Sequence, residues 1–166
     1  MHRRHAPSLF GAAPAAALAQ TPARGLPALK ITNVRAILTQ PAGDNLVIVK
    51  VETSEPGLYG IGCATHRERP LAVAAAINDY LRPFLIGKDP ENIEDIWQSA
   101  YVASYFRSGV TLNNALSGVD GALWDICGKR AGMPVYKLLG GKTRTAAPLY
   151  AHASARELPA LEDQAR

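Results

Sequence analysis

One stretch, residues 111–141, constrains the fold more than any other part of the 166-residue chain. Apolar side chains recur in it at steps of three and four, which places them along one stripe of a helix of about five to six turns. These residues are Leu112, Ala115, Leu116, Val119, Ala122, Leu123, Ile126 and Cys127. Gly132 can adopt the left-handed conformation that closes a helix, and Pro134 prevents its continuation. The pattern predicts a long amphipathic helix against which other elements pack.

Two glycines, Gly118 and Gly121, lie inside this helix one turn apart. Each costs about 1 kcal/mol relative to alanine in a helix interior. We therefore predict that another backbone packs closely against this turn. Asp125 and Lys129 lie off the stripe in the favourable i,i+4 order, which predicts an ion pair.

Residues 30–64 read as three strands joined by short turns. The first run, residues 30–40, alternates with Thr32, Val34, Ala36 and Leu38 on one face. The second run, residues 45–53, places Val47, Val49, Val51 and Thr53 on one face. A third strand, residues 58–64, contains Gly60 and Gly62, which predict close approach of another element. Adjacent strands with short turns indicate an antiparallel meander.

From Pro70 onward the hydrophobic period changes from two to 3.6, which predicts helices. The first helical stripe runs from Val73 to Leu85, and Pro83 is expected to kink or end this helix. Asn92 is expected to begin a second helix. A meander followed by helices predicts an α+β fold in which a helical bundle covers one face of a three-stranded sheet.

The composition, with 48% hydrophobic and 19% charged residues, is that of a folded soluble protein. The net charge of +4 comes without a basic stripe interleaved with aromatics, so we expect no nucleic-acid partner, and we expect no membrane partner either. Cys63 and Cys127 lie in apolar surroundings far apart in the sequence, which favours buried free thiols over a disulfide or a metal pair.

The first 29 residues differ from the rest and are excluded from the expected fold. Arg3 and Arg4 precede a weakly apolar stretch, and Ala17-Leu18-Ala19 resembles a cleavage site. One interpretation is a signal peptide, which would place the protein in the periplasm. The other is a disordered leader of a cytoplasmic protein.

Residues 115–141, ALSGVDGALWDICGKRAGMPVYKLLGG, resemble the end of the capping domain in the mandelate racemase/muconate lactonizing enzyme family of the enolase superfamily. That family has the pattern A-x-x-x-x-D-x-A-L-W-D-x-x-G-K followed by P-x-x-x-L-L-G-G. The run from Ile86 to Trp97 matches a second family pattern, I-G-x-D-P-x-x-I-E-D-I-W. The resemblance implies an enolase-type N-terminal capping domain over residues 30–144. It also implies that residues 145–166 begin a (β/α) barrel, with residues 147–154 as its first strand.

The barrel carries the chemistry in the resembled family, where three acidic residues hold Mg²⁺ and a base removes a proton α to a carboxylate. The acids after Gly141 are Glu157, Glu162 and Asp163, whose spacing predicts a solvated face. We therefore expect neither metal ligands nor catalytic residues in this chain. The resemblance implies the capping domain of an Mg²⁺-dependent acid-sugar dehydratase, truncated before the barrel and inactive alone. The alternative is a non-catalytic interaction module, or the partner of a separately encoded barrel.

The runs GDNLVIVKVET and YAHAS are closest to the mannonate/galactonate dehydratase branch. The resemblance implies that Asn45 and His152 contact the sugar-acid substrate, and that His66 and Arg67 lie in a specificity loop. The alternatives are that Asn45 has only a structural role in the turn and that His152 is a surface histidine. Ala155 replaces the glycine that the branch has after the histidine motif, which puts the local turn in doubt.

Self-association is also expected from the sequence. The apolar segment 146–153 would be an unpaired strand without the rest of a barrel, and an unpaired strand exposes backbone donors and acceptors. The face that carries Gly60 and Gly62 is expected to add exposed apolar area.

Overall fold

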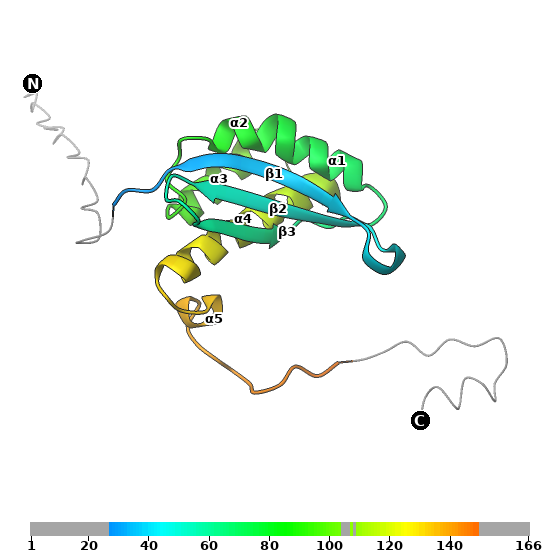
Figure 1. Ribbon diagram of the computed structural model, residues 1–166. Coiled ribbons are helices and arrows are strands. Elements are labelled where there is room, and N and C mark those ends of the chain that lie inside the picture. The colour runs from blue at the N-terminus through cyan, green and yellow to red at the C-terminus, as the bar shows by residue number, and fades with distance from the viewer. Residues whose placement is uncertain (1–26, 104–106, 108, 150–166) are drawn as a thin grey trace, which may run out of the picture.

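Three strands form one antiparallel sheet in the order β1-β2-β3 in the computed structural model, which describes residues 27–103, 107 and 109–149. The strands are β1 (Ile31–Thr39), β2 (Leu46–Thr53) and β3 (Tyr59–Cys63). A short 3₁₀ turn, η1 (Pro41–Gly43), joins β1 to β2. The predicted meander is therefore confirmed (Figure 1).

The inner face of the sheet follows the prediction on β2 and departs from it on β1. Val47, Val49 and Val51 are fully buried, and Thr53 is 9% exposed. On β1 the buried residues are Ile31 and Val34, three positions apart, because the register shifts between Ile31 and Asn33. Such a bulge puts an extra residue in one strand. Two residues predicted for the inner face are therefore exposed: Thr32 beside the bulge, and Leu38, at 45%, near the end of the strand.

The first helical segment runs continuously through α1 (Pro70–Ala75), η2 (Ala76–Leu81) and α2 (Arg82–Leu85). The element η2 is a π-helical turn, and the helix continues for two residues beyond Pro83. The proline was expected to kink or end the helix, since it lacks an N–H group. The helix ends at Leu85, two residues after the proline, and a π turn, with its different hydrogen-bond spacing, precedes the proline.

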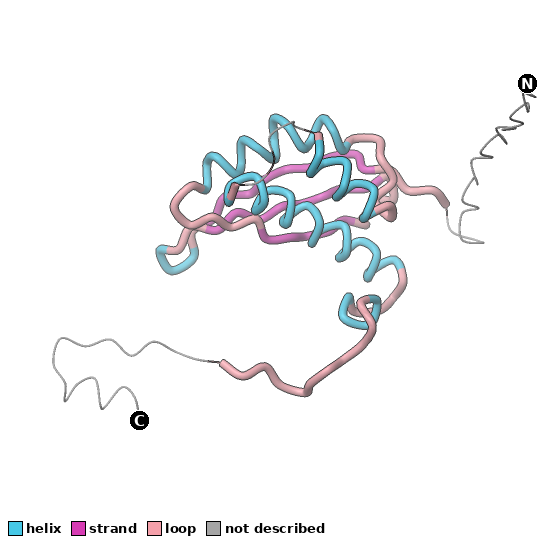
Figure 2. Tube along the Cα trace, turned by 180° about the vertical axis from the view of Figure 1, so that it is seen from behind, coloured by secondary structure: helices cyan, strands magenta, loops and turns pink. Residues whose placement is uncertain are grey.

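The remaining helices are α3 (Ile93–Val102), α4 (Val110–Arg130) and α5 (Val135–Leu138). The helices from α1 to α4 lie on one face of the sheet, as the view from behind shows (Figure 2). The predicted stripe of α4 is buried from Ala115 to Ile126, whereas Leu112 in its first turn is 50% exposed. The predicted α+β architecture is confirmed.

Helix α4 packs against β3 with almost no side chain between the two backbones. A Cβ atom added to Gly60 would lie 1.9 Å from the carbonyl oxygen of Ala122, and one added to Gly62 would lie 1.9 Å from that of Gly118. A Cβ on Gly118 would lie 2.5 Å from the Cβ of Ala64. The close backbone approach predicted from these glycines is therefore present. Their face is covered by α4 and adds no exposed apolar area, which removes one of the reasons to expect self-association.

Both outer edges of the sheet are met by helix side chains. On β3, the Asp125 carboxylate accepts the backbone N–H of Ile61 at 2.9 Å, and Lys129 Nζ donates to the Tyr59 carbonyl at 2.7 Å. Asp125 and Lys129 also form the predicted i,i+4 ion pair at 2.7 Å. On β1, the Asn78 side chain accepts the N–H of Ala36 at 3.0 Å. Helix side chains thus occupy edge positions that another strand would use.

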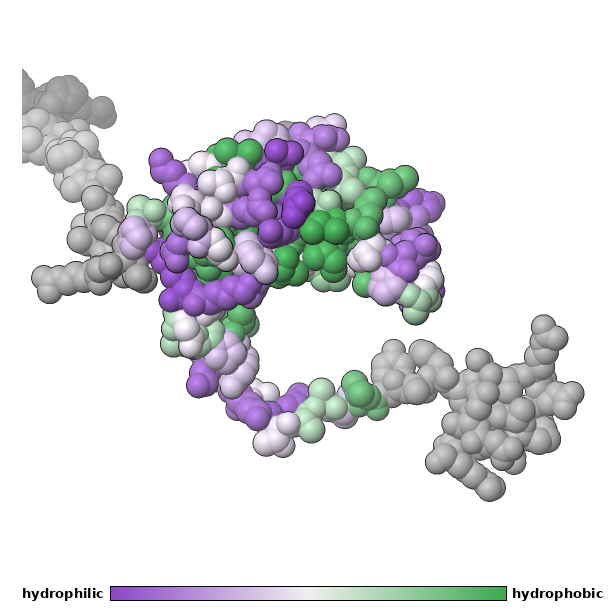
Figure 3. Space-filling view, in the orientation of Figure 1, coloured by the Kyte–Doolittle hydropathy of each residue, from purple (hydrophilic) through white to green (hydrophobic). Residues whose placement is uncertain are grey.

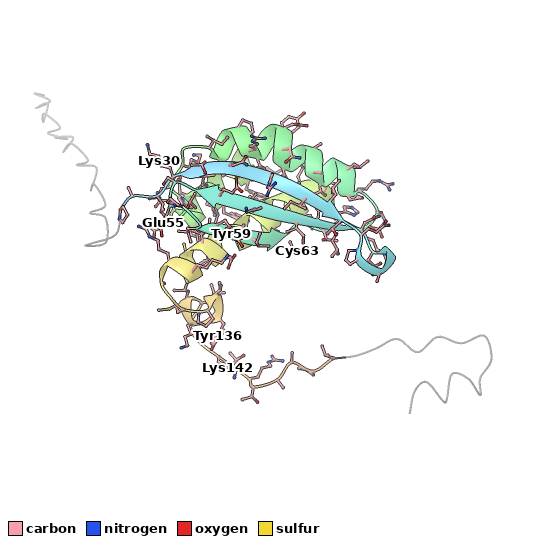
Figure 4. All side chains as sticks on the ribbon, viewed as in Figure 1. Lys30, Glu55, Tyr59, Cys63, Tyr136 and Lys142 are labelled. Atoms are coloured by element: carbon pink, nitrogen blue, oxygen red, sulfur yellow. The ribbon has the colours of Figure 1, made fainter. Side chains whose placement is uncertain are left out.

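The outer face of the sheet is uncovered within the described part of the chain. Register aligns Ile37, Ile48 and Cys63 across the three strands, and hydrophobic residues gather on the half of this face nearer η1 (Figure 3). Cys63 is exposed rather than buried as predicted, because its position in β3 points it outward. Cys127 is half-buried, and both thiols are free. Tyr59 and Cys63 lie toward opposite ends of β3 (Figure 4).

The opposite end of the domain is fixed by Arg130, the last residue of α4. Its side chain is only 6% exposed and pairs with Glu91 at 2.8 Å. It also donates to the backbone carbonyl of Pro27. The segment that leads into β1 is therefore held to the C-terminal end of α4.

The α4–β3 contact predicts opposite outcomes for two matched glycine-to-alanine substitutions. Gly118→Ala should destabilise the domain by about 1–3 kcal/mol, because the new methyl group overlaps Ala64 and Val49 in a filled core. Gly121→Ala places its Cβ at 3.7 Å from Gly62 and should be neutral or stabilising by up to about 1 kcal/mol, through helix propensity alone. Urea denaturation of both variants measures the difference. Equal stability for the two variants would contradict this account of the contact.

Removal of the carboxylate at the β3 edge should promote association between chains. Asp125→Ala frees the N–H of Ile61 and removes the carboxylate that pairs with Lys129, so this N–H becomes available to a strand of another molecule. Asp95→Ala, which removes an exposed carboxylate from α3, is the matched control. We expect the sedimentation coefficient to rise with concentration more steeply for Asp125→Ala than for the control. Indistinguishable profiles would rule out this role of Asp125.

Candidate functional site

Two loops meet at the end of the sheet that lies away from α5 (Figure 1). The first is the turn that contains η1 and ends at Asn45, directly before β2. The second, residues 64–69, leads from β3 into α1. The structure brings three of the predicted site residues together here: Asn45 from the first loop, and His66 and Arg67 from the second.

Asn45 and Asp44 bind the second loop directly. The Asn45 side-chain amide donates to the Arg67 carbonyl at 3.2 Å, and the Arg67 guanidinium lies 2.5 Å from the Asp44 carboxylate. The backbone N–H of Asp44 donates to the Pro41 carbonyl at 3.0 Å and closes the turn. Arg67 and Asp44 have side chains 70% and 55% exposed, so their charged groups face solvent while they hold the loops together.

His66 is the more enclosed residue of the second loop. Its side chain is 19% exposed, and Nδ1 lies 3.2 Å from the Glu68 carboxylate. The backbone carbonyl of His66 accepts the N–H of Arg69 at 3.1 Å, one residue before α1 begins at Pro70. The loop therefore forms a turn that leaves the Arg67 side chain at its outer surface.

Thr65 marks the point at which the chain leaves the sheet. In a regular antiparallel pair two opposite residues exchange both backbone hydrogen bonds. Here Ala64 donates to the Val47 carbonyl at 2.8 Å, but the N–H of Val47 donates to the Thr65 hydroxyl at 3.1 Å. The carbonyl of Thr65 accepts the side-chain amide of Asn114, in the second turn of α4, at 3.1 Å.

Sequence reasoning missed Thr65 and Asn114. Asn114 stands 49 positions from its partner, and it borders the apolar stripe of α4 without belonging to it. A polar residue at the margin of a buried stripe was the only available signal, and it does not identify a partner.

Asn45 also lines an open depression of about 380 Å³ at this end of the sheet. Its walls are Leu38, Thr39, Gln40, Leu46, Pro70 and Leu71. His66 and Arg67 do not line this depression. The amide, guanidinium and imidazole groups of these two neighbouring loops are of the kinds that bind the carboxylate and hydroxyl groups of a small polar ligand. A second, mainly apolar cavity of about 430 Å³ lies among η2, α2, α3 and α4, and none of the predicted site residues lines it.

His152 lies outside the described residues, as do the expected barrel strand beyond residue 149 and the leader up to residue 26. Among the residues that the structure describes, no three His, Cys, Asp or Glu side chains come close enough together to hold a metal ion. These residues therefore do not fit Mg²⁺.

Within residues 27–103, 107 and 109–149, no helix combines the length and apolar character needed to cross a membrane.

Comparison with known families finds one match that covers most of the domain. The model of the mandelate racemase/muconate lactonizing enzyme N-terminal domain matches residues 28–140.

Curated relatives and solved structures agree with this match. The chain is 63% identical over 138 residues to a D-galactonate dehydratase family member from Musicola paradisiaca, and 54% identical over 154 residues to one from Catenulispora acidiphila. These alignments cover 83% and 92% of this chain, but 33% and 36% of the relatives. An enolase from Pantoea ananatis, solved with bound D-gluconate and Mg, superimposes with a TM-score of 0.80 at 61% identity over 82% of this chain and 33% of that one. The chain thus spans about a third of the length of the relatives that it matches.

The ion pair between Asp44 and Arg67 should contribute little to stability. Both side chains are largely exposed, and exposed pairs typically contribute about 0–1 kcal/mol. In a double-mutant cycle with Asp44→Asn and Arg67→Gln, we expect a coupling free energy below about 1 kcal/mol that shrinks as salt is added. Urea denaturation at low and high salt measures it. A coupling that is large and insensitive to salt would mean that the pair is a structural element of the fold.

Proposed function

Because this chain belongs to the mandelate racemase/muconate lactonizing enzyme family, as an N-terminal domain, we propose that it covers the substrate in an acid-sugar dehydratase. The comparisons identify it as the N-terminal domain of a D-galactonate dehydratase family protein of the enolase superfamily. The proposal adds that the loop end of this domain contacts the sugar acid.

One observation carries the proposal: the two loops that hold Asn45, His66 and Arg67 are bound to each other beside an open depression. A sugar acid has one carboxylate and several hydroxyl groups. A guanidinium can bind the carboxylate through two parallel hydrogen bonds, and an amide can both donate to and accept from hydroxyl groups. In this proposal Asn45 and Arg67 contact the substrate, and His66 helps to set which sugar acid fits.

The neighbour from Pantoea ananatis supports this class of ligand, because that protein was solved with D-gluconate and Mg. The described residues of the present chain do not fit the metal ion, and we assign no chemical step to them. We propose that the 166-residue chain alone does not dehydrate sugar acids, and that His152 joins the site only when the barrel completes it.

The test is a hybrid enzyme. Residues 27–149 of this chain replace the matching residues of the Pantoea ananatis enolase, and binding of D-gluconate in the presence of Mg²⁺ is measured by calorimetry. We expect the hybrid to bind D-gluconate and Asn45→Ala to weaken binding about ten-fold, because a buried hydrogen bond to the ligand is lost. Asn92→Ala is the matched control, since it removes an exposed amide at the start of α3.

The 166-residue chain alone, with Mg²⁺ and either D-gluconate or D-galactonate, is expected to yield no 2-keto-3-deoxy acid. A hybrid that folds but binds D-gluconate equally well with and without the Asn45 amide would refute the substrate-covering role. That result would favour the alternative, a non-catalytic interaction domain.

A further inference from the structure

The second loop of the candidate site is held by contacts to two different elements. On one side, the hydroxyl of Thr65 accepts the N–H of Val47 in β2 at 3.1 Å. On the other side, the carbonyl of Thr65 accepts the side-chain amide of Asn114 in α4 at 3.1 Å. One residue thus connects the loop to both the sheet and the long helix, immediately before His66 and Arg67.

These contacts determine the direction in which the chain leaves the sheet. A regular ladder would take the N–H of Val47 to a backbone carbonyl of the third strand and would keep the chain in the plane of the sheet. The hydroxyl of Thr65 takes that position instead, and its carbonyl turns to Asn114. The chain then bends over the start of β2, where the Arg67 carbonyl reaches the Asn45 amide at 3.2 Å.

We propose that Thr65 and Asn114 are positioning residues, which fix the loop 66–69 so that Arg67 and Asn45 face the sugar acid in one geometry. This inference rests on the proposed function for its ligand, but its structural part can be tested without one. Neither residue touches the ligand in this proposal. Each acts through the loop, and the hydroxyl of Thr65 is the group that matters rather than its methyl group.

The structural test uses the full 166-residue chain and limited digestion with trypsin. The loop contains one good site, after Arg67, because Arg69 precedes Pro70. Cleavage after Lys50, within β2, reports global unfolding, and cleavage after Lys142, in the exposed segment after α5, reports the activity of the protease. Mass spectrometry follows the three cleavages separately in each variant.

Thr65→Val keeps the branched shape and removes the hydroxyl, and Asn114→Leu removes the amide donor. We expect each to raise the rate of cleavage after Arg67 by about three-fold to ten-fold over that after Lys50, as the loss of one hydrogen bond predicts for local opening. Thr65→Ser keeps the hydroxyl and should behave like the natural chain. Asn113→Leu, at the exposed neighbouring position, is the control for Asn114.

Three results would overturn the positioning role. The first is an unchanged rate after Arg67 in Thr65→Val or in Asn114→Leu. The second is a Thr65→Ser variant that opens as fast as Thr65→Val, because the methyl group would then be responsible. The third is a parallel rise after Lys50, which would make the residues part of global stability.

The hybrid enzyme separates this inference from the proposed function. We expect Thr65→Val to raise the dissociation constant for D-gluconate several-fold in the hybrid, and Thr65→Ser to restore it. If Asn45→Ala has no effect on D-gluconate binding, the proposed function fails whatever trypsin shows. If Asn45→Ala weakens binding and Thr65→Val leaves the dissociation constant unchanged, the proposed function stands and the positioning role is wrong.

Discussion

The contact between α4 and β3 is the constraint on which the rest of the domain depends. Gly60 and Gly62 let the carbonyls of the helix approach the strand more closely than any side chain would allow. That approach brings Asp125 and Lys129 over the edge of β3, where they bind its backbone. It also sets the position of Asn114 beside Thr65, which follows the end of β3. One steric requirement thus fixes the helix, the sheet edge and the candidate site.

The described residues of the candidate site form contacts that hold loops in place, and their charged groups are not buried. Asn45 and Asp44 bind the second loop from the first loop, while Asn114 binds it from α4. The charged groups that remain at the surface belong to exposed side chains. Such an arrangement leaves amide and guanidinium groups at the surface of the loops, where they can form hydrogen bonds with a polar ligand.

Much of the fold could be predicted because β2 and α4 carry their hydrophobic patterns without interruption. Every inward residue of β2 and the buried stripe of α4 were identified correctly. One error lies at the bulge at Ile31, which exposes Thr32. Others lie near the ends of elements, where Leu38 and Leu112 are exposed, and at Cys63, which is on the outer face of β3. For the site, the resemblance to a family indicated Asn45, His66 and Arg67. The contacts of Thr65 could not be predicted, since side chains replace backbone partners there across 18 and 49 positions of sequence.

The contacts of Arg130 with Glu91 and with the Pro27 carbonyl bear on where another molecule can be attached to the domain. The segment at Pro27 and the helix α5 both lie at the end of the domain away from the turn η1 (Figures 1 and 2). Both segments therefore lie at one end of the domain, and the turn η1 and the loop 64–69 lie at the other. A dye, a surface tether or a fused protein attached at Pro27 would therefore be joined at the end of the domain opposite the turn η1.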